Sequence, residues 1–171
     1  MNIHPIFVHF PIALLTVYAI LELIRFNQIT SQIYWFYVKA SILFAGALGA
    51  FAALSTGDGA EHAVAKDLRP LVEIHSTFAA ISTWIFAFIG IIYVVMWVNK
   101  TDWNQQIFDS RFSNIWGTIL NIATKIYESY FIIILAFLGL VAITMTGALG
   151  GAIVYGPNID PVVSFFYHLV M

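Results

Sequence analysis

The sequence predicts an all-α membrane protein, an up-down bundle of four transmembrane helices with short interfacial helices. Of its 171 residues, 61% are hydrophobic and only 9% are charged, whereas soluble domains have roughly 25% charged residues. The mean hydropathy is +0.88. Four apolar stretches approach the roughly 20 residues that a helix needs to cross a bilayer. We therefore expect residues 1–171 to form a single transmembrane domain.

The first two spans are expected at residues 7–23 and 35–55. Pro11 is compatible with the first span because a proline in the opening turn removes no hydrogen bond that the helix makes. The sequence Gly57-Asp58-Gly59 is expected to end the second helix.

The third and fourth spans are expected at residues 74–98 and 130–149. Between them, isoleucines recur at helical spacing at positions 115, 119, 122 and 126. This pattern predicts either an amphipathic helix in the membrane interface or the lower half of a long fourth helix. After the fourth span, residues 160–171 predict a short interfacial helix with Asp160 as its cap and Pro161 at its first position.

The positive charges predict how the bundle is oriented. The side of the first and third loops carries Arg25, Lys39, Lys100, Arg111 and Lys125, and the other side carries Lys66 and Arg69. Because cytoplasmic loops are enriched in these residues, we expect a multi-pass protein of the inner membrane with both termini in the periplasm. Glu22 and Arg25, three residues apart, are expected to pair at the inner interface with snorkelling side chains.

Composition and motifs exclude several classes of function. The absence of cysteine excludes disulfides, thiolate metal sites and covalently attached haem. A net charge of −2 gives no electrostatic footprint for nucleic acid. We find no nucleotide-binding loop and no nucleophile–base pair, which argues against an enzyme acting alone. No lysine or arginine precedes Arg25, so the first span is expected to be retained rather than cleaved as a signal peptide.

Four of the five histidines are expected at one face of the membrane. His4 and His9 open the first span, His62 follows the second and His75 opens the third. Ionisable groups at membrane depth are costly, so this gathering indicates a site. His4 and His9 would lie about 140° apart on one helix and cannot easily share a small ligand. His4 is therefore either an ordinary interfacial side chain or a ligand, and His168 near the C-terminus is a weaker candidate.

His9 and His75 are the leading candidate ligands for a cofactor. Two imidazoles at matched depth on different helices of a bundle suit bis-histidine ligation of haem b. The second nitrogen of each ring then needs an acceptor, and Glu73, Glu61 and Asp58 are nearby candidates.

Gly46 and Gly49 of the second span have two interpretations. They let a flat macrocycle approach the helix backbone, or they form a small-residue contact between helices, which we favour.

Two other classes of function remain open. His4, His9, His62, Asp58 and Glu61 are candidate ligands for an outward-facing Zn²⁺ or Cu²⁺ site of a metal-binding or metal-transporting protein. Their spacing is not diagnostic, and a solvated loop is favoured for His62. The third hypothesis is a cofactor-free structural subunit of a membrane complex.

Four segments resemble, in the same order, a family of prokaryotic membrane proteins of unknown function called DUF2231. HPIFVHFPIALL (residues 4–15) resembles its opening signature, and TGDGAEHAV (56–64) its acidic turn. IHSTFA (74–79) resembles the start of its third helix, and TGALGGAIVYG (146–156) the glycine-rich end of its fourth. The family often has an acidic residue directly after the third-helix histidine, where this chain has Ser76.

The resemblance implies a four-helix membrane protein. It also implies a role in electron transfer, because family members occur fused to, or encoded beside, cytochrome c and Rieske-type modules. The partners expected on this basis are other membrane subunits or a periplasmic cytochrome. Electrons would pass between membrane quinol and a periplasmic carrier, or within a larger respiratory assembly.

Overall fold

The computed structural model describes residues 4–24, 26–61, 66–108 and 111–171. Every regular element in these ranges is a helix, which confirms the all-α class. The elements are α1 (His4–Leu23), α2 (Asn27–Thr30), α3 (Ile33–Glu61), η1 (Lys66–Leu68), α4 (Arg69–Asn99), α5 (Trp103–Phe108), α6 (Ser113–Glu128), α7 (Tyr130–Tyr155) and α8 (Pro161–Val170).

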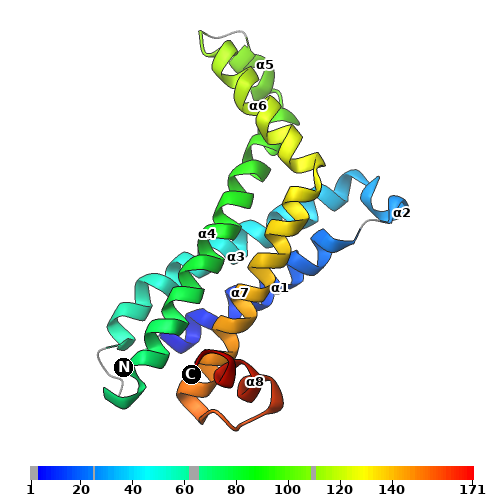
Figure 1. Ribbon diagram of the computed structural model, residues 1–171. Coiled ribbons are helices and arrows are strands. Elements are labelled where there is room, and N and C mark those ends of the chain that lie inside the picture. Colours follow the sequence, from blue (N-terminus) through cyan, green and yellow to red (C-terminus); the bar gives the residue numbers. More distant parts are fainter. Residues whose placement is uncertain (1–3, 25, 62–65, 109–110) are drawn as a thin grey trace.

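Helices α1, α3, α4 and α7 form the bundle. Packing runs around a ring, with α1 on α3, α3 on α4, α4 on α7 and α7 on α1. Successive long helices run in opposite directions, as Figure 1 shows. One end of the molecule therefore holds the N-terminus, the start of α4 and helix α8, and the other end holds α5 and α6.

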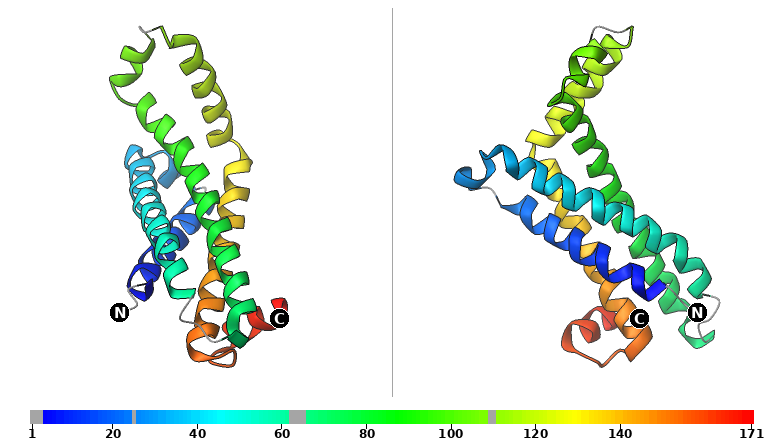
Figure 2. Two further views of the ribbon diagram at one scale, coloured as in Figure 1. Left: turned by 90° about the vertical axis from the view of Figure 1, so that its left-hand side faces the viewer. Right: turned by 180° about the vertical axis from the view of Figure 1, so that it is seen from behind.

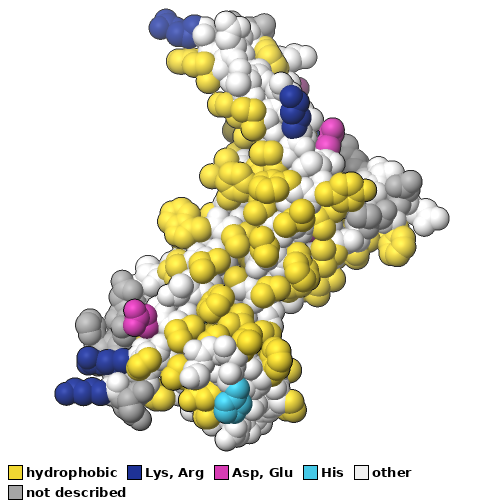
Figure 3. Space-filling model, in the orientation of Figure 1, with side chains coloured by type: hydrophobic (Ala, Val, Ile, Leu, Met, Phe, Trp, Pro, Cys, Tyr) yellow, Lys and Arg dark blue, Asp and Glu magenta, His cyan; other side chains and the backbone are white. Residues whose placement is uncertain are grey.

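Within the part of the chain that the structure describes, three helices are long and apolar enough to cross a membrane, namely Tyr34–Gly57 within α3, Arg69–Asn99 and Tyr130–Tyr155. The apolar part of α1, Val8–Leu23, is shorter, so its role as the first span stays a prediction. Hydrophobic side chains cover the middle of the molecule in Figure 3, and the charged side chains in view lie towards its ends. This distribution is the one that a membrane-embedded bundle requires.

Three predicted helix boundaries were wrong. Helix α3 continues past Gly57 to Glu61, since a helical glycine costs only about 1 kcal/mol. Helix α4 begins at Arg69 rather than at residue 74, because Pro70 fits its first turn. Helix α7 continues beyond residue 149 to Tyr155 and ends where Gly156 adopts a φ of 91°, a conformation that glycine tolerates best.

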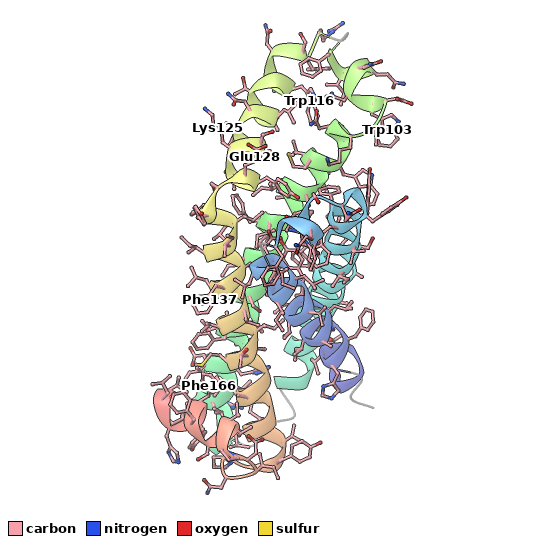
Figure 4. The ribbon with its side chains drawn as sticks, turned by 90° about the vertical axis from the view of Figure 1, so that its right-hand side faces the viewer. Trp103, Trp116, Lys125, Glu128, Phe137 and Phe166 are labelled. Atoms are coloured by element: carbon pink, nitrogen blue, oxygen red, sulfur yellow. The ribbon has the colours of Figure 1, made fainter. Side chains whose placement is uncertain are left out.

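The polar stretch between α4 and α7 folds into α5 and α6. Figure 2 shows α6 continuing the line of α7 beside α4, after a break at Ser129, whose backbone is extended. Of the two predicted arrangements, the extension of the fourth helix therefore describes it better. The indole Nε1 of Trp116 donates a hydrogen bond to Asn104 Oδ1 at 2.8 Å and ties α6 to α5. Figure 4 shows Lys125 and Glu128 on the outer side of α6.

Helix α8 begins as the sequence predicts. Asp160 is its N-cap, and Oδ1 accepts hydrogen bonds from the backbone N–H groups of Val162 (2.8 Å) and Val163 (3.0 Å). Val163 is buried against α7 beside Leu149 and Ala152. The cap and this apolar contact hold α8 on the end of α7.

Replacing Asp160 by alanine should loosen α8. Loss of an N-cap costs about 1 kcal/mol, so the amide hydrogens of α8 should exchange about fivefold faster with solvent. Hydrogen-exchange mass spectrometry in detergent measures this change. Asn158→Ala, at an exposed position in the same turn, is the control and should leave the exchange of α8 unchanged. Equal exchange in both variants would contradict the capping role.

Across the bundle centre, α1 meets α4 through aromatic rings. The rings of Tyr18 and Phe86 make an edge contact with centroids 6.0 Å apart, and both side chains are fully buried. Helix α7 approaches the ring of Phe86 at Gly139, where an added Cβ atom would lie 2.8 Å from Phe86 Cζ. A residue without a side chain is therefore needed at this contact.

Candidate functional site

The histidine end of the molecule is the first candidate site. His4 and His9 lie on the first turns of α1, His75 lies on the second turn of α4, and His168 lies on α8. These three helix segments lie at one end of the bundle in Figure 1, and the left view of Figure 2 shows the start of α1 and helix α8 on opposite sides of that end. His62 lies outside the described residues, and the side chain of His4 is not described.

His75 is held against α7 by a hydrogen bond. Its ring is half-buried, and Nδ1 donates to the backbone carbonyl oxygen of Thr146 at 2.9 Å. A carbonyl oxygen can only accept, so Nδ1 carries the hydrogen. In the neutral ring, Nε2 then carries the lone pair that binds metals. The described partner of Nδ1 is thus a backbone group of α7. The side chains of Asp58 and Glu61, two of the carboxylates indicated by the sequence, are not described, so their role as acceptors stays a prediction.

His9 lies in a different environment. Its side chain is exposed on α1, next to the exposed ring of Phe10. His9 and His75 therefore share an end of the bundle but not the same degree of burial. Their joint ligation of one haem stays a prediction.

A buried ionic cluster lies where the C-terminal parts of α1 and α4 meet the N-terminal part of α3. The carboxylate oxygen Oε2 of Glu22 accepts hydrogen bonds from Tyr93 Oη (2.7 Å), Lys39 Nζ (2.9 Å) and Tyr18 Oη (3.1 Å). Glu22 is 1% exposed and Lys39 is 5% exposed. Three helices thus supply partners to one carboxylate.

Aromatic rings complete the surroundings of Lys39. Its Nζ lies 5.7 Å from the ring centroid of Tyr93 and 5.9 Å from that of Tyr127, which brings α6 into the cluster. Phe36 stacks on Tyr93 with ring centroids 5.4 Å apart. These ring faces stabilise a cation that has left water.

Sequence reasoning missed this cluster. It placed Glu22 at the interface, whereas Glu22 is buried and pairs with Lys39. Arg25 lies outside the described residues, so the expected pairing of Glu22 with Arg25 stays a prediction. From the sequence, Lys39 was used only as one of the positive charges on the side of the first and third loops. Its position inside the predicted span at 35–55 was a usable signal, because a charge there needs a partner within the protein.

Comparison with known families agrees with the segments noted in the sequence. A family model described as a predicted membrane protein, DUF2231, matches residues 1–160. The chain belongs to the DUF2231 family. No curated protein and no solved structure matches it.

In this DUF2231 protein, Ser76 occupies the position at which the resemblance led us to expect an acidic residue. The Ser76 side chain is exposed, and its hydroxyl donates to the backbone carbonyl of Glu73 at 3.0 Å. Thr77 donates to the same carbonyl at 2.8 Å. Residue 76 therefore points away from the seam between α4 and α7 in which His75 lies.

The two glycines of α3 pack against α1. A Cβ atom at Gly46 would lie 2.7 Å from Leu15 Cδ2, and one at Gly49 would lie 3.4 Å from the ring of Pro11. Both distances indicate close helix packing, which was the interpretation favoured from the sequence. A contact of Gly46 or Gly49 with a macrocycle stays a prediction.

The proposed Zn²⁺ or Cu²⁺ ligands fall largely outside what the structure describes. His62 lies in the undescribed stretch, and the side chains of His4, Asp58 and Glu61 are likewise not described. Among the described side chains, no three His, Cys, Asp or Glu residues gather into a metal-binding group. The metal hypothesis therefore stays a prediction for the DUF2231 protein.

Proposed function

We propose that the protein is a membrane-embedded electron-transfer protein, or a subunit of a respiratory complex, that binds haem b near its outer face. His75 is the first axial ligand, through Nε2, and His9 is the second. The haem supplies one-electron transfer. Its partners are other subunits of the inner membrane or a periplasmic cytochrome.

The hydrogen bond from His75 to Thr146 is the observation that carries this proposal. Histidines that ligate metals usually donate their other ring N–H to a carbonyl or carboxylate, which fixes the ring and makes the ligating nitrogen more basic. The Nδ1 of His75 makes such a bond at 2.9 Å. The chemistry of this side chain therefore fits an axial ligand.

The exposed positive charges support an outward-facing histidine end. Lys100, Arg111 and Lys125 are exposed at the end that carries α5 and α6, and Lys66 and Arg69 are exposed at the histidine end. The α5–α6 end thus carries more exposed positive charges than the histidine end. Lys39 is buried and paired with Glu22, so it adds little to this difference in exposed charge. We place the α5–α6 end in the cytoplasm and both termini in the periplasm.

The optical spectrum of the protein purified from haem-replete cells tests the proposal. We expect a Soret band and about one haem per chain. His75→Ala should abolish the band, and His9→Ala should abolish it or convert it to a five-coordinate spectrum. His168→Ala is the control, because His168 is exposed at the same end, and it should leave the spectrum unchanged.

Two results would overturn the proposal in different ways. A haem-free protein excludes haem binding, and stoichiometric Zn²⁺ or Cu²⁺ in elemental analysis would then favour the metal-binding alternative. A Soret band that survives both His9→Ala and His75→Ala would exclude these two ligands while leaving haem binding intact.

A further inference from the structure

The contact between His75 and Thr146 depends on which residue follows Thr146 by one helical turn. In an α-helix, the carbonyl of residue i points along the axis towards the N–H of residue i+4. A donor from a neighbouring helix must therefore reach that carbonyl past the side chain at this position. In α7 the residue four positions after Thr146 is Gly150.

Gly150 leaves room for the imidazole. A Cβ atom built at Gly150 would lie 3.2 Å from Cε1 and 3.5 Å from Nδ1 of His75. The first distance is too short for an ordinary contact. A methyl group would thus press on the ring next to the nitrogen that donates to Thr146, and the 2.9 Å bond would lengthen or break.

The side chain of Thr146 does not take part in this contact. Its hydroxyl is buried and donates to the backbone carbonyl of Ala142 at 2.9 Å. His75 thus uses only the backbone of Thr146. A side chain at residue 150 would contact the ring, whereas the side chain of residue 146 takes no part in the bond.

The neighbouring glycines of the same segment have different surroundings. A Cβ atom at Gly151 would meet Val163 of α8 at 3.3 Å, and one at Gly147 meets no described atom within 4 Å. Of these three glycines, the described contacts place only Gly150 against the histidine. At the glycine-rich end of α7, Gly150 therefore packs against the ring of His75, and Gly151 packs against Val163 of α8.

We propose that Gly150 is a positioning residue for His75. By lacking a side chain, it opens the Thr146 carbonyl to the ring and holds the imidazole as its Nδ1–H tautomer, with Nε2 as the ligating nitrogen. Its effect on haem rests on the proposed function. Its effect on the position and tautomer of the ring does not.

The ring itself gives a test that needs no haem. We would label the full-length protein with ¹⁵N-histidine, record imidazole nitrogen spectra in detergent, and assign His75 among the five histidines with His75→Gln. In the unchanged chain, Nδ1 of His75 should be protonated and Nε2 should not. Gly150→Ala should shift these signals to a mixture of tautomers.

Two variants of the same segment serve as controls. Gly147→Ala adds the same methyl group where no described atom lies within 4 Å, and Thr146→Ala keeps the carbonyl. Both should give the tautomer of the unchanged chain. An Nε2–H tautomer in the unchanged chain would overturn the proposal, even if Gly150→Ala fails to fold. So would a Gly150→Ala spectrum identical to that of Gly147→Ala.

The haem-loaded protein separates this inference from the proposed function. Loss of a hydrogen-bond partner of a ligating histidine typically lowers metal affinity by about 10- to 100-fold, so Gly150→Ala should weaken haem binding by that factor and Gly147→Ala should not. If the tautomer changes as expected but no haem binds, the positioning role stands and the haem proposal fails. If haem binds equally to Gly150→Ala and to the unchanged chain and the tautomer is also the same in both, the positioning role fails and the haem proposal stands.

Discussion

Replacing Lys39 by methionine should destabilise the protein by about 3–5 kcal/mol, the usual cost of removing one partner from a buried ion pair. The reason is the position of Glu22. Its carboxylate is 1% exposed, and without Lys39 it would lose the ammonium group that lies 2.9 Å from Oε2. Unfolding in mixed detergent micelles, followed by tryptophan fluorescence, measures the change.

The same cluster offers a matched rescue and a matched control. Changing the cluster to apolar residues, as in Glu22→Leu with Lys39→Met, Tyr93→Phe and Tyr18→Phe, removes the carboxylate together with the groups that donate to it and should recover most of the loss. Lys100→Met removes an exposed lysine whose Nζ lies 5.2 Å from the ring centroid of Phe36, and it should have little effect. If Lys39→Met costs no more than Lys100→Met, the buried pair does not stabilise the bundle.

Replacing Gly139 by alanine should cost about 1–3 kcal/mol, as overpacking a tight core does. The added Cβ would lie 2.8 Å from Cζ and 3.0 Å from Cε2 of Phe86. That ring is fully buried and held by Tyr18, so it cannot move away cheaply. The melting temperature in detergent should fall.

Gly90 provides the control for this second prediction. It is buried on α4, but its nearest neighbour would lie 4.0 Å from an added Cβ. Gly90→Ala should therefore be neutral or slightly stabilising, since alanine favours the helix. Phe86→Leu combined with Gly139→Ala should restore part of the loss. Equal melting temperatures for the Gly139 and Gly90 variants would contradict a packing role for Gly139.

The helices could be predicted from the sequence because local patterns determine them. Long apolar stretches predicted the four long helices, three of which are long and apolar enough within the described residues to cross a membrane. The Asp160-Pro161 pair predicted the start of α8. The isoleucine spacing gave α6. The predicted end of α3 near Gly57 was wrong because a glycine lowers helix stability without forbidding a helix. The predicted start of α4 at residue 74 was wrong because Pro70 is compatible with a first helical turn.

The contacts of both candidate sites could not be predicted from the sequence. Glu22 accepts hydrogen bonds from Lys39 and from Tyr93, which lies 71 positions further along the chain. His75 donates to a backbone carbonyl, also 71 positions away, and a backbone carbonyl has no sequence signature. Only Gly150 marks this contact in the sequence, and its importance depends on knowing that His75 packs against it.

The pairing of Glu22 with Lys39 has a consequence for biosynthesis. A lone charge at the centre of a membrane helix raises the cost of insertion by about 2.5–3.5 kcal/mol, and by less towards the ends. Glu22 and Lys39 lie on α1 and α3, two consecutive long helices, and neutralise each other. The insertion machinery would therefore release α1 and α3 more readily as one closed hairpin than as separate helices. When α4 follows, Tyr93 would donate its hydrogen bond to a Glu22 carboxylate that is already paired with Lys39.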